Sequence, residues 1–440
     1  MNKKKSQFKI ALLGNMNNNN FALMRYFIDL GYESNLILFT NDCSGNSKHF
    51  EPICDTWDIG KWQKYILKTK ISDNPTSIFE LPLSLFLFLF YYLRYLLNNK
   101  NKFHFPISKK NIRSTLSNYT HFIGSGTSPS ILKRINTPLT VFYPYSGGVE
   151  WLGEPIIVQK QHFSNFIERF LINKVITKQL SGLRNAKNII SPELYTKYVY
   201  EKYKLESIFL MCPLVYNLET LPHILENSKF ENVLNRINAS DFSILSHSRH
   251  LWKNTNNYTL DDWKLFDKNN DWYINSFSQF TKLGYSSEPL LILFEYGDDV
   301  LHSKKLIEEL GISKYIIWLT KSDRKEIMWL LSNVDVGIGE FYDLPNILFG
   351  GTGYEVLASG KPLIQGFNFI DNKFEEIYGI PPPPLLRVTN ESDITNHFIN
   401  LAKDKSLVSK IGSESKKWFD NYCGIGLAKK WLNLITNETI

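Results

Sequence analysis

A glycine-rich turn directly before an amphipathic run is the feature of the sequence that most suggests chemistry. The stretch FGGTGYEVLASGKPLIQ, residues 349–365, places Gly350, Gly351 and Thr352 where a helix is expected to begin. The first amides of a helix lack partners inside it, so they and the positive helix end favour an anion such as a diphosphate. Glu355 follows about one turn later, where a carboxylate can accept hydrogen bonds from the vicinal hydroxyls of a ribose. The alternative is a first-turn acid stabilised only by the helix dipole.

A second stretch, SHSRHLWK at residues 246–253, carries two cations at the end of an apolar run. Arg249 and Lys253 are four residues apart and follow a predicted strand. Two cations suit a diphosphate leaving group, whose negative charge grows as its bond to a sugar breaks. Each charge-assisted hydrogen bond contributes about 1.5–3 kcal/mol. Taken alone the stretch is typical of a solvated basic loop, but beside the glycine turn it indicates an anion site.

Three residues are candidates for a general base that would take the proton from an attacking hydroxyl group. His121 stands at a strand end, Glu150 follows SGG, and His247 lies beside the predicted diphosphate site. Histidine titrates near neutral pH, which suits this role, although each of the three also has an ordinary structural interpretation. The four cysteines and nine histidines are scattered without zinc spacing. No zinc site is therefore expected, and the prediction includes no cofactor.

The elements that must position these residues begin with an α/β pattern. FKIALLG, residues 8–14, predicts a buried strand ending at Gly14; a helical run follows, and then a strand at 35–39. Strand, helix and strand open a doubly wound sheet. The asparagines at 17–20 fall in the first strand-to-helix loop, where such sheets bind ligands. With further strands such as HFIGSG and LTVFYPYSGG, the pattern predicts a first Rossmann-like domain over residues 1–215.

A second α/β series follows NSKFENVLNRINAS, which we interpret as a polar connector. Its predicted strands include FSILS, PLLILFEYG, YIIWLT and DVGIGE, and SDRKEIMWLLSNV predicts a helix with Ser322 as its N-cap. These elements predict a second Rossmann-like domain over residues 216–414. The last helix, within 415–440, is expected to cross back to the first domain. Two such domains would face a cleft lined by their strand ends.

Composition excludes few classes of protein. The 440 residues are 43% hydrophobic, enough for two cores, and the net charge of +7 is modest for that length. The amino-terminal apolar run is too short for a secretory signal, so a cytoplasmic protein is expected.

One segment, from Leu81 to Leu97, is apolar on nearly every side, and Arg94 is its single charge. It is shorter than the roughly 20 residues of a membrane span. A buried helix, a face lying in the membrane interface and a true span all remain open. The Lys- and Arg-containing stretch that follows would suit anionic lipid, so we favour peripheral contact at the inner face of the cytoplasmic membrane.

Several of these motifs, in this order, resemble one known family. EVLASGKPLI is similar to the E-A-M-A-S-G-K-P-V-I signature of GT-B glycosyltransferases, most closely the retaining family called GT4. SRHLWKN resembles its G-R-x-x-x-x-K-G element, and NVDVGIGE its A-D-V-F-V-x-P-S strand. The resemblance implies that Arg249 and Lys253 hold the donor diphosphate and that Glu355 binds the donor ribose. It places the amides of residues 350–352 toward the donor, and Gly14 near the transferred sugar.

The chain departs from the family at one important position. The E-x7-E motif of the family places its first glutamate, which faces the donor sugar, where this chain has Ile347. Glu340 and Asp343 are the nearby acids that would have to substitute for it. The Asp-x-Asp pattern with which GT-A enzymes hold a divalent ion does not occur in the sequence, which favours a metal-independent site.

The resulting prediction is an enzyme that transfers a hexose-like unit from a nucleotide-sugar to a glycan or lipid-linked acceptor, in bacterial surface polysaccharide synthesis. A glycosyltransferase-like binding or scaffold protein is the alternative, because of Ile347. A nucleic-acid-binding protein ranks last: it needs a clustered basic face with stacking aromatics, whereas the aromatic residues here lie mostly within apolar periodic runs.

Overall fold

The computed structural model shows two compact units, each built on its own parallel sheet. No helix in the described part of the chain is long and apolar enough to cross a membrane. The segment from Leu81 to Leu97, with its predicted membrane contact, falls outside that part. The structure describes residues 8–38, 51–69, 109–144, 176–212, 215–223, 228–253, 263–264, 266–342, 344–369 and 372–436.

The two units are not two continuous halves of the sequence. Ile53–Trp57 belongs to the second unit, although the residues on both sides of it belong to the first. The second unit otherwise covers Leu214–Leu427, and the expected boundary at residue 414 falls inside a helix, α17 (Lys405–Tyr422). The first unit consists of Met1–Pro52, Asp58–Pro213 and Ala428–Ile440.

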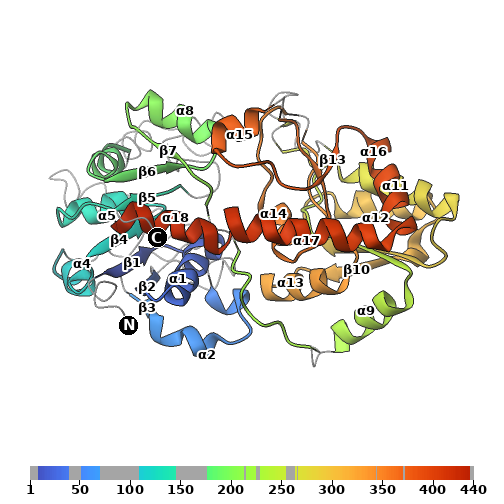
Figure 1. Cartoon of the computed structure of the whole chain (residues 1–440), viewed down its shortest axis with the longest axis horizontal. Helices are drawn as coiled ribbons and strands as arrows, with labels where there is room; N and C mark the ends of the chain where they lie inside the picture. Colours follow the sequence, from blue (N-terminus) through green and yellow to red (C-terminus); the bar gives the residue numbers. More distant parts are fainter. Residues whose placement is uncertain are drawn as a thin grey trace, which may run out of the picture. The chain divides into compact units, whose positions relative to one another are not determined.

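The sheet of the first unit has seven parallel strands in the order β3-β2-β1-β4-β5-β6-β7. The order of the strands reverses between β1 and β4, as in doubly wound folds. Figure 1 shows these strands with their helices. The strands are β1 (Lys9–Leu13), β2 (Glu33–Leu38), β3 (Ile66–Lys68), β4 (His121–Gly124), β5 (Val141–Phe142), β6 (Asn188–Ser191) and β7 (Ile208–Phe209), and the longer helices are α1 (Asn19–Asp29), α4 (Lys109–Leu116), α5 (Ser128–Arg134), α8 (Leu194–Lys202) and most of α18 (Ile425–Thr436).

The sheet of the second unit has six parallel strands in the order β10-β9-β8-β11-β12-β13. Here the order reverses between β8 and β11. The strands are β8 (Phe242–Ser246), β9 (Pro289–Glu295), β10 (Ile316–Thr320), β11 (Val336–Ile338), β12 (Leu363–Gly366) and β13 (Leu386–Val388), and the helices with α17 are α9 (Ser228–Ala239), α11 (Asn270–Leu283), α12 (Val300–Glu309), α13 (Arg324–Asn333), α14 (Gly351–Ala358), α15 (Lys373–Tyr378) and α16 (Glu391–Lys403).

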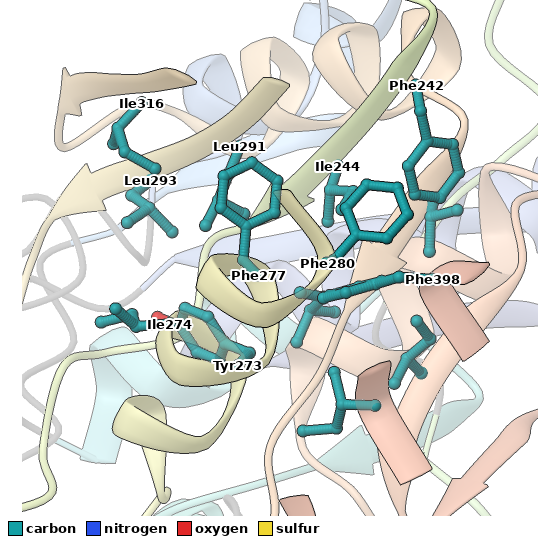
Figure 2. Close-up of a cluster of buried hydrophobic side chains, with 14 of the residues drawn as sticks. Phe242, Ile244, Tyr273, Ile274, Phe277, Phe280, Leu291, Leu293, Ile316 and Phe398 are labelled. Atoms are coloured by element: carbon teal, nitrogen blue, oxygen red, sulfur yellow. The ribbon is translucent and has the colours of Figure 1, made fainter. Parts of the chain in front are cut away.

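Aromatic side chains dominate the core of the second unit. Phe280 of α11 packs edge-on against Phe242 of β8 and Phe398 of α16, with ring centroids 5.5 and 5.8 Å apart. Figure 2 shows these rings together with the apolar side chains of the central strands. Burying a phenylalanine side chain contributes about 1.5–3 kcal/mol. This core holds β8 and β11 in place, and the loops that follow these two strands carry the charged residues described below.

Two local predictions were wrong. The segment interpreted as a polar connector forms α9, because Phe230, Val233 and Ile237 recur at helical spacing and are buried. The N-cap of α13 is Asp323 rather than Ser322, since Asp323 and Glu326 form a capping box.

Candidate functional site

The carboxyl edge of the second sheet collects charged residues where the strand order reverses. His247 and Arg249 follow β8, and Glu340 follows its neighbour β11. In open parallel sheets this reversal point leaves a crevice at the strand ends, and ligands bind there. The topology therefore brings together the basic stretch of the sequence and an acid that is 91 residues further along the chain.

The glycine turn meets the same edge. Gly350 is the N-cap of α14, which begins at Gly351, within the expected glycine turn. Described residues accept no hydrogen bond from the amides of Gly351 and Thr352, as is normal for a first helical turn. A Cβ added to Gly350 would lie 3.2 Å from Oε2 of Glu340, so this carboxylate stands directly beside the start of the helix.

Glu340 is the centre of a buried network. Its Oε1 lies 2.6 Å from Nζ of Lys268, and its Oε2 accepts a hydrogen bond of 2.5 Å from the Tyr342 hydroxyl. Burial alone would raise the pKa of Glu340, but the Lys268 charge, the hydrogen bonds from Lys268 and Tyr342 and the charge of Arg249 together lower it. Lys268 was missed in the sequence, because it stands in a loop with no motif around it.

Glu355 is the centre of a second network, and it is 7% exposed. Its Oε2 lies 2.6 Å from Nε2 of His247, and its Oε1 accepts a 2.6 Å hydrogen bond from Nε of Arg324. Burial would raise the pKa of Glu355, but the Arg324 charge and the bonds from His247 and Arg324 lower it to about 2. The Glu355 carboxylate is therefore ion-paired. His247 stays a predicted general base, and in the structure its Nε2 faces this carboxylate.

Arg324 also contacts Asp55, whose Oδ1 lies 3.1 Å from its Nη1. Burial would lower the pKa of Arg324, but the two carboxylates, Asp55 and Glu355, raise it instead. Arg324 is the first residue of α13 and directly follows the N-cap at the carboxyl edge. Sequence reasoning recognised the start of this helix but missed the arginine; a cation at the first position after a strand-end loop was the available signal.

The two predicted diphosphate ligands have different surroundings. Arg249 is exposed, and its charge acts on Glu340 at the start of α14. Lys253 is also exposed, but its Nζ lies 4.6 Å from the Trp252 ring and its charge acts on Asp271. The charge of Arg249 therefore acts at the carboxylate beside the glycine turn, and that of Lys253 acts at the start of α11.

In the first unit, Gly14 ends β1 beside β4, at the reversal point of that sheet, with φ of 81°. Asn20 braces this turn, because its Nδ2 donates to the carbonyls of Leu13 and Gly14 at 3.1 and 2.6 Å. Its Oδ1 accepts a 2.9 Å hydrogen bond from the Tyr143 hydroxyl. Asn20 thus holds the backbone of the turn after β1.

The other base candidates do not reach this edge. His121 is the first residue of β4 and stands at the amino end of the strand, with its ring centroid 5.2 Å from that of Phe8. Because ligands bind at the opposite, carboxyl edge, the prediction of His121 as a general base is corrected. Glu150 lies outside the described residues. Within the described ranges no group of three potential metal ligands comes together.

The two doubly wound parallel sheets, with charged residues at the reversal point of the second, have the two-domain α/β fold of GT-B glycosyltransferases. The chain is similar to HepE of Anabaena, solved in complex with UDP and glucose, at 13% identity and a TM-score of 0.55, over 98% of this chain and 100% of that one. It is also similar to sucrose-phosphate synthase from Thermosynechococcus elongatus, with 13% sequence identity, a TM-score of 0.52 and coverage of 98% of both chains. A third similar structure is a TarM variant of S. aureus, solved with UDP. The sequence identity is 12%, the TM-score is 0.51, and the match covers 97% of this chain and 99% of that one. No family model and no curated protein matches the sequence.

Proposed function

We propose that the protein is a glycosyltransferase that moves a sugar from a nucleotide-sugar donor to a glycan or lipid-linked acceptor. One observation carries the proposal: the unpartnered amides at the start of α14 stand beside Glu340 at the reversal point of the second sheet, and the charge of Arg249 acts on that carboxylate. The neighbours solved with UDP support the same class of ligand.

In this proposal the donor diphosphate binds the amides of Gly350, Gly351 and Thr352 and the guanidinium of Arg249. These donors stabilise the charge that develops on the leaving group. The family resemblance assigns Lys253 to the diphosphate as well, although in the structure its charge acts on Asp271 at the start of α11. Glu355 accepts hydrogen bonds from the ribose: a carboxylate offers about four acceptor positions, and His247 and Arg324 use two of them.

The finer points of the proposal rest on the family resemblance. They are a GT4-type retaining reaction without a metal, Gly14 near the transferred sugar, and Glu150 or His247 as the general base. The proposed setting is surface polysaccharide synthesis at the inner face of the bacterial membrane, with contact through the segment from Leu81 to Leu97.

A second candidate function is a binding protein with impaired catalysis. Two observations favour it. Ile347 occupies the position of the family's first glutamate, and the nearby acid Glu340 is neutralised by Lys268. Such a protein would bind a nucleotide-sugar without transferring or hydrolysing it.

A thermal-shift panel of UDP-, GDP- and ADP-sugars tests donor binding, and release of the nucleoside diphosphate tests turnover. We expect one donor class to stabilise the protein, and Arg249→Ala to remove most of the shift. The matched control is Arg113→Ala, which removes an exposed arginine from α4 of the first unit. If no donor stabilises the wild-type protein while a known transferase responds, the proposal is wrong. Stabilisation without turnover would favour the binding protein.

A further inference from the structure

Arg324 joins two buried carboxylates that come from distant parts of the chain. Its Nε donates to Glu355 of α14 at 2.6 Å, and its Nη1 lies 3.1 Å from Asp55. The side chains of Asp55 and Glu355 are 2% and 9% exposed, so neither carboxylate has much contact with water.

We propose that Arg324 is a positioning residue: it fixes the orientation of the Glu355 carboxylate for the donor ribose, and Asp55 in turn fixes Arg324. This inference rests on the proposed function, because it concerns the same donor site. It adds two residues that have no counterpart in the motifs of the sequence.

The geometry of the guanidinium explains why the orientation is fixed. The group is planar and rigid, so bonds from Nε to one acid and from Nη1 to the other leave it little freedom to rotate. The backbone of Arg324 is held as well, because Arg324 lies between Asp323 and Glu326, the two residues that form the capping box of α13. His247 holds the second oxygen of Glu355. The carboxylate is therefore restrained at both oxygens, and its remaining acceptor positions point in defined directions.

Asp55 is anchored by its neighbours in the Ile53–Trp57 segment. The Thr56 hydroxyl and the Trp57 amide both donate to Oε1 of Glu219, at 2.5 and 2.9 Å. Nζ of Lys325 lies 5.2 Å from the Trp57 ring. The segment thus has contacts of its own with the second unit, and it holds Asp55 against Arg324.

A pocket of about 170 Å³ borders this network and is lined in part by Asp55, Trp57 and Arg324. It is large enough to admit water, and the Asp55 and Arg324 side chains in its lining offer hydrogen bonds. Water can therefore replace part of a lost guanidinium contact, and we expect conservative variants of Asp55 and Arg324 to fold.

The test measures how strongly the protein distinguishes ribose hydroxyls. Calorimetry first gives the Kd of UDP, GDP and ADP. The Kd is then measured for the 2′-deoxy and 3′-deoxy forms of the nucleotide that binds most tightly. It is applied to wild type, Arg324→Lys, Asp55→Asn and the control Asp58→Asn. Asp58 is a suitable control because it is an exposed N-cap three residues away, and asparagine caps equally well.

For wild type and Asp58→Asn we expect removal of one ribose hydroxyl to weaken binding about tenfold or more, as for a hydrogen bond to a charged group. The measured quantity is the ratio of the Kd of the deoxy nucleotide to the Kd of the parent nucleotide. In Arg324→Lys and Asp55→Asn we expect this ratio to fall below about threefold, because a loosened carboxylate no longer favours the hydroxyl. A merely structural role would weaken all the nucleotides equally and leave the ratio unchanged.

The ratio separates this inference from the proposed function. If wild type binds a nucleotide and both variants keep its ratio, the inference is overturned and the donor site stands. If wild type binds but ignores the ribose hydroxyls, the inference fails together with the ribose role of Glu355. If wild type binds no nucleotide, the proposed function fails and the inference falls with it. Melting curves of each variant verify that it is folded.

Discussion

Lys268 and Glu340 form a buried ion pair at the start of α14, with Nζ 2.6 Å from Oε1 and each side chain 9% exposed. The pair lies beside the amides that we assign to the diphosphate. It neutralises an acid that would otherwise repel the phosphates, so it makes this end of the helix a better anion site.

Lys268→Met removes the cation and leaves Glu340 buried without its charged partner. Breaking a buried pair in this way typically costs about 3–5 kcal/mol. We expect a loss of that size in the free energy of unfolding, measured with urea at neutral pH.

Two controls accompany this substitution. Adding Glu340→Gln removes the unpaired charge and should restore most of the loss. Lys304→Met breaks a pair with Glu295 whose side chains are 36% and 39% exposed, and it should cost about 0–1 kcal/mol. A similar loss in the exposed and the buried pair would contradict the account of Lys268.

Glu355 should contribute to the acid sensitivity of the protein. Its pKa is lowered from 4.5 to about 2, so the folded state favours the charged form, and this stabilisation is complete above about pH 4.5. It is lost as the pH falls from about 4.5 toward 2. We expect Glu355→Gln to be clearly less stable than wild type at pH 6, with a smaller difference at pH 3. Urea unfolding at pH 6 and at pH 3 measures the difference in stability between the wild type and the variant. An equal difference at the two pH values would show that Glu355 has no lowered pKa.

His250 should make the stability of the protein depend on pH in a higher pH range than Glu355 does. Burial lowers the pKa of His250 from 6.5 to about 4, and the charge of Asp299 opposes the shift only in part. The unfolded chain therefore binds a proton more readily, and stability falls as the pH decreases from 6.5 to 4. His250→Gln should flatten this part of the profile. The exposed His223 gives a matched control, since His223→Gln should retain the wild-type slope.

The two glycines at the start of α14 should respond differently to alanine. Gly350→Ala brings a methyl group to 3.2 Å from Oε2 of Glu340, so a fixed carboxylate must move. We expect a loss of roughly 1 kcal/mol in stability and weaker nucleotide binding. Gly351→Ala meets no atom within 4 Å, and restricting the unfolded chain should stabilise by roughly 0.4–1 kcal/mol. Thermal melts with and without UDP compare the two; an equal effect on both would argue against close approach at Gly350.

The sequence was sufficient for the features that depend on local pattern. The apolar runs before Gly14 and after residue 241 form β1 and β8, and the turn at Gly350 starts a helix. Short strands were harder to predict from the sequence. β13 has three residues, Leu386–Val388, which is too few for a visible period. Helix α9 was mistaken for a connector because its polar residues outnumber the three that it buries.

The pairing of the site residues was not predictable from local pattern. Arg324 and Glu355 are 31 positions apart, and Asp55 is a further 269 positions from Arg324. Such contacts depend on which strands are neighbours and on where Ile53–Trp57 packs. The spacing of residues along one element carries no information about either.

The assignment of Ile53–Trp57 to the second unit has a practical consequence for dissecting the protein. A gene fragment encoding only Leu214–Leu427 would be continuous, but the polypeptide would lack five residues of its own unit. Arg324 would then keep Glu355 and lose Asp55, and Glu219 would lose both of the donors that it receives from that segment. A truncated domain would therefore give a misleading measure of nucleotide affinity, and the full chain is the right material for studying the site.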